Sequence, residues 1–188
     1  MKTKMDAFKN LFRKKFTEDL DIKDADFDKL GIKLKKEIDA IFGRSLAIRE
    51  LDSGSDNSTE IEMVNLTTPH YDIERFGVTF VASPRHADVI AITGAVTRNM
   101  ELAVRKTYEA TPGPKFVVAV GDDACGKGIF NGSYAVLGGA DKVLPVDLYI
   151  PGNPPTPKEI LKGLLALMQK IRKNRSGSER HSPHIVAV

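Results

Sequence analysis

Residues 89–120 read VIAITGAVTRNMELAVRKTYEATPGPKFVVAV, and this stretch decides the fold class. It begins and ends in short apolar runs, Val89–Thr93 and Phe116–Val120, which predict strands. Between them, Thr97–Ala110 has helical spacing and is followed by a proline that would end a helix. Its apolar side consists of Met100, Val104 and Tyr108. Apolar strands that alternate with helices are typical of a parallel sheet covered on both faces, so the stretch predicts an α/β fold.

The same alternation extends outward in both directions. Further short apolar runs predict strands at Leu46–Leu51, Val78–Ala82 and Val146–Ile150. After the last run, Thr156-Pro157-Lys158-Glu159 combines an N-cap, a proline at the first helical position and a glutamate three residues after the cap. This pattern predicts a final helix that ends near Arg172. We therefore expect a three-layer α/β sandwich with a mostly parallel, flavodoxin-like sheet.

The α/β pattern covers residues 44–172, which we expect to form the folded domain. Residues 173–188 are mostly polar, offer little to bury and predict a mobile tail. His181 and His184 lie in this tail, but a mobile pair lacks the further ligands and supporting hydrogen bonds that a metal site needs. Metal binding is therefore not expected there.

Residues 1–43 are expected to be a helical N-terminal extension. Its first part, Met1–Phe16, is basic and amphipathic. The apolar stripe of this part consists of Met5, Phe8, Phe12 and Phe16. Three roles stay open for it: docking on an anionic membrane surface, docking in a groove of a partner, and packing on its own domain. The second part repeats apolar positions at helical spacing from Phe27 to Ile41 and stops at Gly43.

Composition narrows the class of protein. The chain has 188 residues and a net charge of +3, and its basic residues form local runs, so nucleic-acid binding is not expected. The one cysteine, Cys125, excludes an intrachain disulfide and suits a reducing compartment. No apolar stretch approaches the length of a membrane-spanning helix, and no signal-peptide core follows the start. We expect a cytoplasmic protein that is soluble or held peripherally on the membrane face through a complex.

The loops after the predicted strands are the places to look for a site, because ligands of open α/β sheets bind outside the carboxyl ends of the strands. These loops comprise residues 52–62, 93–99, 121–128 and 151–155. Their glycines and prolines allow tight turns that bring the backbone close to a ligand. The glycines from Gly121 to Gly128 lack the spacing of a dinucleotide-binding fingerprint, so a nucleotide site is not expected. Composition alone predicts only a crevice at one edge of the sheet.

An ordered set of short strings carries a family resemblance. The strings are RSLAIRE (44–50), YDIERFG (71–77), ASPRHAD (82–88), TGAVTRN (93–99), YEATP (108–112), GIF (128–130) and PVDLYIPG (145–152). Together they closely resemble the small subunit of membrane-bound group 4 nickel-iron hydrogenases and the related 20 kDa subunit of complex I. The resemblance covers about Arg44 to Met168 in unbroken order. Chance could produce one such string but not the ordered set.

The resemblance implies a 4Fe-4S cluster held by four cysteines on the strand-end loops, and all four positions are substituted here. They carry Asp56, Thr59, Asp123 and Asn153, while the turns around them remain. Thr59 and Asn153 are neutral donors, whereas a cluster depends on soft thiolates. Cys125, the only thiol, follows the third position by two residues and is expected to be a small, partly buried side chain. We therefore expect no cofactor.

Other polar residues near these loops have competing interpretations. Asp56, Asp122, Asp123 and Glu60 suit a hard cation by ligand chemistry, although acidic loop residues are more often merely solvated. A protein that stands alone could therefore have reused the crevice for a small ligand or cation. Self-association through an exposed apolar docking surface would instead indicate an orphaned subunit.

The resemblance also implies contacts with a partner. Arg75, Arg85 and Arg98 are candidate contacts to a large subunit or a neighbouring cluster, and Glu60 belongs to the same set; solvation at the surface is the alternative. His86 is a candidate proton-relay or quinone-side residue by resemblance, but hydrogen bonds that fix its loop are the expected role.

Two functions follow from these observations. The leading hypothesis is a cluster-less structural or regulatory small subunit of a hydrogenase-like or complex I-like oxidoreductase complex, which does not catalyse a reaction alone. Its expected partner is the large subunit of that complex, with ferredoxin-like and membrane subunits as further candidates. The alternative is an electron-transferring iron-sulfur subunit with altered cluster ligands. In that alternative the cluster is held by altered ligands or by cysteines of a partner, and changing Asp56 or Asp123 to alanine is expected to abolish iron binding.

Overall fold

The computed structural model describes residues 24–175. The basic amphipathic segment Met1–Phe16 and the two histidines of the C-terminal tail, His181 and His184, lie outside the described residues. None of the helices within residues 24–175 has the length and hydropathy needed to cross a membrane.

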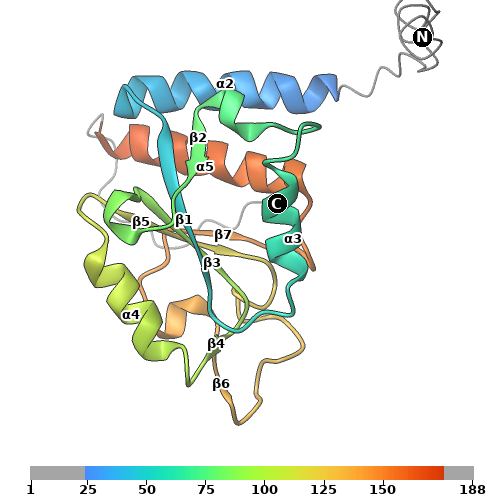
Figure 1. Ribbon diagram of the computed structural model, residues 1–188, viewed down its shortest axis with the longest axis vertical. Helices are drawn as coiled ribbons and strands as arrows, with labels where there is room; N and C mark the ends of the chain where they lie inside the picture. Colours follow the sequence, from blue (N-terminus) through green and yellow to red (C-terminus); the bar gives the residue numbers. More distant parts are fainter. Residues whose placement is uncertain (1–23, 176–188) are drawn as a thin grey trace, which may run out of the picture.

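A five-stranded parallel sheet forms the centre of the molecule (Figure 1). Its strands are β1 (Leu46–Asp52), β2 (Val78–Phe80), β3 (Val89–Thr93), β5 (Phe116–Val120) and β7 (Leu148–Ile150). They lie in the order β2-β1-β3-β5-β7, and every neighbouring pair is parallel. When only these strands are counted along the chain, the order is the 2-1-3-4-5 order of flavodoxin-like sheets. The predicted fold class is therefore confirmed.

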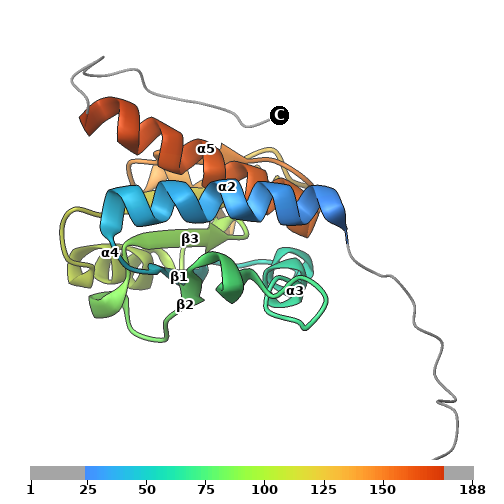
Figure 2. The same cartoon turned by 90° about the horizontal axis from the view of Figure 1, so that it is seen from above.

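Helices cover both faces of this sheet and complete the three layers (Figure 2). Side chains alternate along β3, so that Val89 and Ala91 pack in one apolar cluster and Ile90 and Ile92 in the other. The first cluster lies under α2 (Ala25–Phe42) and α5 (Pro157–Arg175). The second lies under α4 (Glu101–Ala110), where Val104 is fully buried as its helical spacing predicts. All five residues of β3, four of them apolar, can be buried because each face of the sheet meets its own core.

Helix α2 ends as the sequence predicts and packs on the sheet domain. The Asp24 carboxylate accepts hydrogen bonds from the Asp26 and Phe27 N–H groups, and Gly43 ends the helix at φ 63°. Its buried side chains belong to the same apolar cluster as β1 and α5. An ion pair between Arg172 and Glu37, at 3.0 Å, joins α5 to α2 at the surface. The described part of the predicted N-terminal extension is thus packed on the α/β domain.

The predicted capping box at the start of α5 is confirmed. The Thr156 N–H and hydroxyl both donate to the Glu159 carboxylate at 2.8 Å, and the Glu159 N–H donates to the Thr156 hydroxyl at 3.4 Å. The helix runs to Arg175, slightly beyond the predicted end near Arg172. Basic residues fill its last turn, where they interact favourably with the helix dipole.

Several short elements differ from the prediction. Helix α3 (Ser58–Asn65) lies where we expected the end of a loop. Strands β4 (Val96–Thr97) and β6 (Val136–Gly138) form a separate antiparallel pair, so α4 begins at Glu101 rather than at Thr97. Strands β2 and β7 are shorter than predicted. Short 3-10 helices complete the chain: η1 (Ile73–Phe76), η2 (Pro84–His86) and η3 (Ala140–Lys142).

Candidate functional site

The loops after β1 and β3 meet at the point where the strand order reverses, which is the usual ligand site of such sheets. The fully buried Ser53 hydroxyl lies within hydrogen-bond distance of the Thr93 carbonyl, at 2.9 Å, and of the Gly94 carbonyl, at 3.0 Å. A side chain on Gly94, whose φ is +73°, would overlap the backbone of Ser55. These two loops are therefore in direct contact.

Asp56 sits on the loop after β1 and fixes the start of α3. Its carboxylate accepts hydrogen bonds from the Ser58 N–H at 2.9 Å and from the Ser58 hydroxyl at 2.5 Å. These bonds, the hydroxyl first, lower the pKa of Asp56, so the exposed carboxylate stays ionised at neutral pH. These bonds to the first residue of α3 account for the geometry of Asp56.

Thr59 lies in the first turn of α3 and faces the loop after β5. It is 6% exposed. A Cβ added to Gly121 would lie 2.5 Å from the Thr59 hydroxyl oxygen, so the hydroxyl rests on the Gly121 backbone. Gly121 has φ +90°, which glycine adopts without strain. Thr59, at the position of the family's second cysteine, is therefore buried against the loop after β5.

Asp123 carries a buried, unsatisfied oxygen. Its Oδ1 has no hydrogen-bond partner among the described residues and lies against Gly128, where a side chain would overlap it. Burial raises the pKa of Asp123, and the nearby Asp56 raises it further, while a hydrogen bond from the Phe130 N–H offsets part of the effect. Asp56 and Asp123, on loops of different strands, are thus close enough to repel each other.

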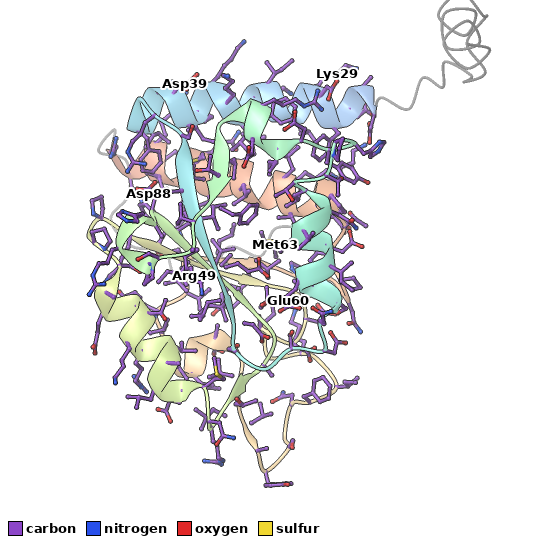
Figure 3. The ribbon with its side chains drawn as sticks, viewed as in Figure 1. Lys29, Asp39, Arg49, Glu60, Met63 and Asp88 are labelled. Atoms are coloured by element: carbon purple, nitrogen blue, oxygen red, sulfur yellow. The ribbon has the colours of Figure 1, made fainter. Side chains whose placement is uncertain are left out.

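Glu60 lies next to this pair, on the side of α3 that carries the buried Met63 (Figure 3). Both of its carboxylate oxygens are buried and have no hydrogen-bond partner within residues 24–175. The pKa of Glu50, which is half-buried on β1, is raised by burial first and by Glu60 second. The hydroxyl of the fully buried Thr93 is also unpartnered. Carboxylates with few hydrogen-bond partners therefore extend from the loops to β1, where the charge of Arg49 offsets part of the effect on Glu50. The sequence signal for Glu50, a charge inside an apolar strand, could have identified it.

Asn153 lies on the loop after β7 and is exposed. That loop is tied to the loop after β5 by Asp122, whose carboxylate accepts from the Gly152 N–H at 2.9 Å and whose N–H donates to the Gly152 carbonyl at 2.8 Å. The four positions of the family's cysteines therefore lie after the carboxyl ends of β1, β5 and β7, at one edge of the sheet. Thr59 rests on Gly121, and the charge of Asp56 acts on Asp123.

Cys125 is directed away from this edge. It packs beside the apolar cluster under α4, and its Sγ lies 3.8 Å from the Ala119 carbonyl oxygen. Burial, with a smaller effect of Asp122, raises the pKa of the Cys125 thiol to about 12. The group is a protonated thiol at neutral pH rather than a metal-binding thiolate.

The predicted partner-contact residues do not form one surface with the loops. Arg75 pairs with Asp28 of α2 at 2.5 Å and lies over the Phe76 ring, before β2 and so at the amino end of that strand. Arg85 and His86 are exposed on η2, where Ser83 caps the short helix by accepting from the Arg85 N–H at 3.4 Å. Two of the set join the loop region: the Arg98 Nε donates to the Tyr134 carbonyl at 2.7 Å, and Glu60 lies close enough to Asp123 to raise its pKa.

The residues at this edge do not fit a 4Fe-4S cluster. The four ligand positions supply two carboxylates, one hydroxyl and one amide, while the only thiol is protonated and directed elsewhere. Within residues 24–175, no group of three or more histidine, cysteine or acidic side chains is arranged to hold a metal ion.

The chain is similar in sequence and in structure to several known proteins. The family profile described as the 20 kDa subunit of NADH ubiquinone oxidoreductase matches residues 57–167. A probable membrane-bound hydrogenase subunit, mbhJ of Pyrococcus furiosus, is 42% identical over 135 residues, which cover 72% of this chain and 81% of that protein. A chain from the structure of the membrane-bound sulfane sulfur reductase, an archaeal respiratory membrane complex, matches with a TM-score of 0.62 and 37% identity, over 71% of this chain and 73% of that one.

Proposed function

The chain belongs to the 20 kDa subunit family of NADH ubiquinone oxidoreductase, which includes hydrogenase small subunits, and we propose that it is a structural or regulatory subunit that carries no cluster. In this role it assembles with the large subunit of a hydrogenase-like or complex I-like complex. It does not relay electrons itself. Ferredoxin-like and membrane subunits of the same complex are further partners, and the complex holds the chain at the cytoplasmic face of a membrane.

One observation carries this proposal: the scaffold is kept while every ligand position is replaced by an oxygen-donor side chain. Two replacements have local structural roles that a ligand could not keep, because the Asp56 carboxylate accepts hydrogen bonds from Ser58 and the Thr59 hydroxyl packs on Gly121. Asp123 is desolvated and lies beside other carboxylates. Three thiolates would be missing even if Cys125 were to rotate toward the loops.

Assembly with a large subunit is supported by the ancestry of the chain. The hydrogenase subunit and the reductase chain that it resembles both come from membrane-bound complexes by their names. The strand-end loops keep their turns although the cluster ligands are gone, which is expected if the loops still serve a contact.

Affinity purification from native membranes tests the proposal. The tagged full chain, solubilised anaerobically in mild detergent, should co-purify with a hydrogenase-type or complex I-type large subunit in stoichiometric amounts, identified by mass spectrometry. Purification of the chain alone, from membranes that contain an intact complex of this kind, would refute assembly. Loss of iron from the chain on Asp56→Ala or Asp123→Ala substitution would support the electron-transferring alternative instead.

A further inference from the structure

Two large apolar side chains project from the segment that joins β5 to β6. Tyr134 is 91% exposed and Ile129 is 81% exposed, the highest values among the large apolar side chains of residues 24–175. The β4–β6 pair at the end of this segment lies at the far end of the molecule from α2 and α5 (Figure 1). Single exposed apolar residues are ordinary, but two on one loop at the family's site indicate a contact surface.

This segment is held in one conformation by hydrogen bonds. The Asn131 amide donates to the Gly126 carbonyl at 2.8 Å. Arg98 fixes the other end, because its Nε donates to the Tyr134 carbonyl at 2.7 Å and its N–H donates to the Ala135 carbonyl at 2.9 Å. A surface that is already ordered loses little conformational entropy on binding. The segment that carries Tyr134 and Ile129 therefore needs little further ordering when a partner binds.

Uncompensated negative charge lies at the start of the same segment. Asp122 and Asp123 are joined there by Asp56 and Glu60 from the neighbouring loop and helix, and the interactions among them raise the pKa of Asp123 after burial. None of these four carboxylates forms an ion pair with a described residue, whereas Asp28, Asp88 and Glu37 elsewhere in the domain all do. The buried oxygens of Asp123 and Glu60, which have no hydrogen-bond partner within residues 24–175, destabilise the free chain, and a basic partner would relieve them.

We propose that residues 122–135 and the start of α3 dock on the large subunit of the complex, which places an arginine or lysine side chain beside Asp56 and Asp123. The positive charge of the partner stands where the family holds its cluster, and Tyr134 and Ile129 fill an apolar pocket next to it. This inference rests on the proposed function and adds the surface and the chemistry of the contact.

A second copy of the chain fits this surface poorly. A symmetric dimer through it would use the same patch on both subunits and place the carboxylates of the two copies near each other. Like charges across an interface oppose association. The basic residues 1–16 of the same chain are the other candidate occupant, and the experiment separates them from a partner.

Photo-cross-linking in the purified complex tests the contact. The full chain carries p-benzoylphenylalanine in place of Tyr134 or, as a control, of Leu102, which is 62% exposed on α4. We expect the probe at position 134 to attach to the large subunit near a basic residue, and the probe at 102 to leave that subunit unmodified. Attachment only to a second copy, attachment only to residues 1–16, or no attachment at 134 would overturn the proposal. Absence of any large subunit from the complex would instead contradict the proposed function.

Charge removal supplies a second test with opposite effects on folding and binding. Asp123→Asn should raise the melting temperature of the isolated chain, because it removes a desolvated charge, yet weaken retention of the large subunit roughly tenfold or more. Glu109→Gln makes the same change of charge at an exposed position of α4 and should alter neither property. A loss of chain stability with Asp123→Asn would indicate a merely structural carboxylate and overturn the assignment, as would unchanged retention.

Discussion

Alkylation of Cys125 by iodoacetamide is expected to be about 1,000-fold slower in the folded chain than in the unfolded chain. Burial raises the pKa of this thiol from 9.0 to about 12, a difference of three units. Only the thiolate reacts, so the reactive fraction at neutral or mildly basic pH falls by about the same factor of 1,000. The half-buried position of the Sγ beside the apolar cluster slows the approach of the reagent further.

The assay follows the mass of the intact chain during labelling at about pH 8, a pH at which an ordinary thiol is partly ionised. The same chain in concentrated guanidinium supplies the unfolded rate, and because Cys125 is the only cysteine each rate belongs to one site. A matched control places the cysteine on the surface, as Tyr134→Cys in a Cys125→Ala background, where the side chain is 91% exposed. The control should react at nearly the unfolded rate.

A folded-state rate within tenfold of the unfolded rate would refute the reasoning. It would mean that Cys125 is available as a thiolate, and that one soft ligand could reach the strand-end loops. The assignment of an inert thiol, and with it part of the case against a cluster, would then be lost.

Three further predictions concern stability. Gly31→Ala should lower the free energy of unfolding by roughly 1–3 kcal/mol, although alanine favours helices, because the new methyl group overlaps the Phe76 ring. The control, Lys33→Ala on the exposed side of α2, should leave the free energy of urea unfolding nearly unchanged. Asp88→Ala should lower the free energy of unfolding by roughly 1–3 kcal/mol, because it removes the acceptor of the Ala47 N–H and the ion pair with Arg44. Asp88→Asn keeps an acceptor and should lower it less. Equal losses in the two variants would contradict the hydrogen-bond assignment. The pKa of Glu50 is raised, so the folded chain binds the proton of this carboxyl more tightly than the unfolded chain does. Glu50→Gln should therefore raise the melting temperature at neutral pH. The gain should disappear as the pH falls below 4.5, the ordinary pKa of a glutamate. A gain that persists in acid would refute burial as the cause.

The central sheet could be predicted from the sequence because its strands are buried on both faces. A strand such as Val89–Thr93 need not alternate apolar and polar residues when each face of the sheet has its own apolar cluster. Helices between such strands indicate that the strands are parallel. The capping box at Thr156 and the stop at Gly43 are local signals, and both were confirmed. By contrast, β4 and β6 are very short and depend on pairing between distant residues, which no local pattern reveals.

The candidate site was predictable only in part. The family resemblance located the ligand positions and showed that their cysteines are absent. The contacts that now occupy the edge join residues far apart in sequence, as where the Thr59 hydroxyl rests on Gly121, and spacing cannot predict such packing. The helix that starts at Ser58 was not predicted because its first residues are polar and its N-cap, Asn57, makes no side-chain capping hydrogen bond; Asp56 accepts from the Ser58 N–H instead.

We propose that the scaffold is intact and that four side chains prevent a cluster from forming. Anaerobic reconstitution with iron and sulfide, read by electron paramagnetic resonance after reduction, tests it on two chains side by side. The natural chain should show no 4Fe-4S signal, while the variant with Asp56→Cys, Thr59→Cys, Asp123→Cys and Asn153→Cys should gain a stoichiometric one. A stoichiometric cluster in the natural chain would contradict the account.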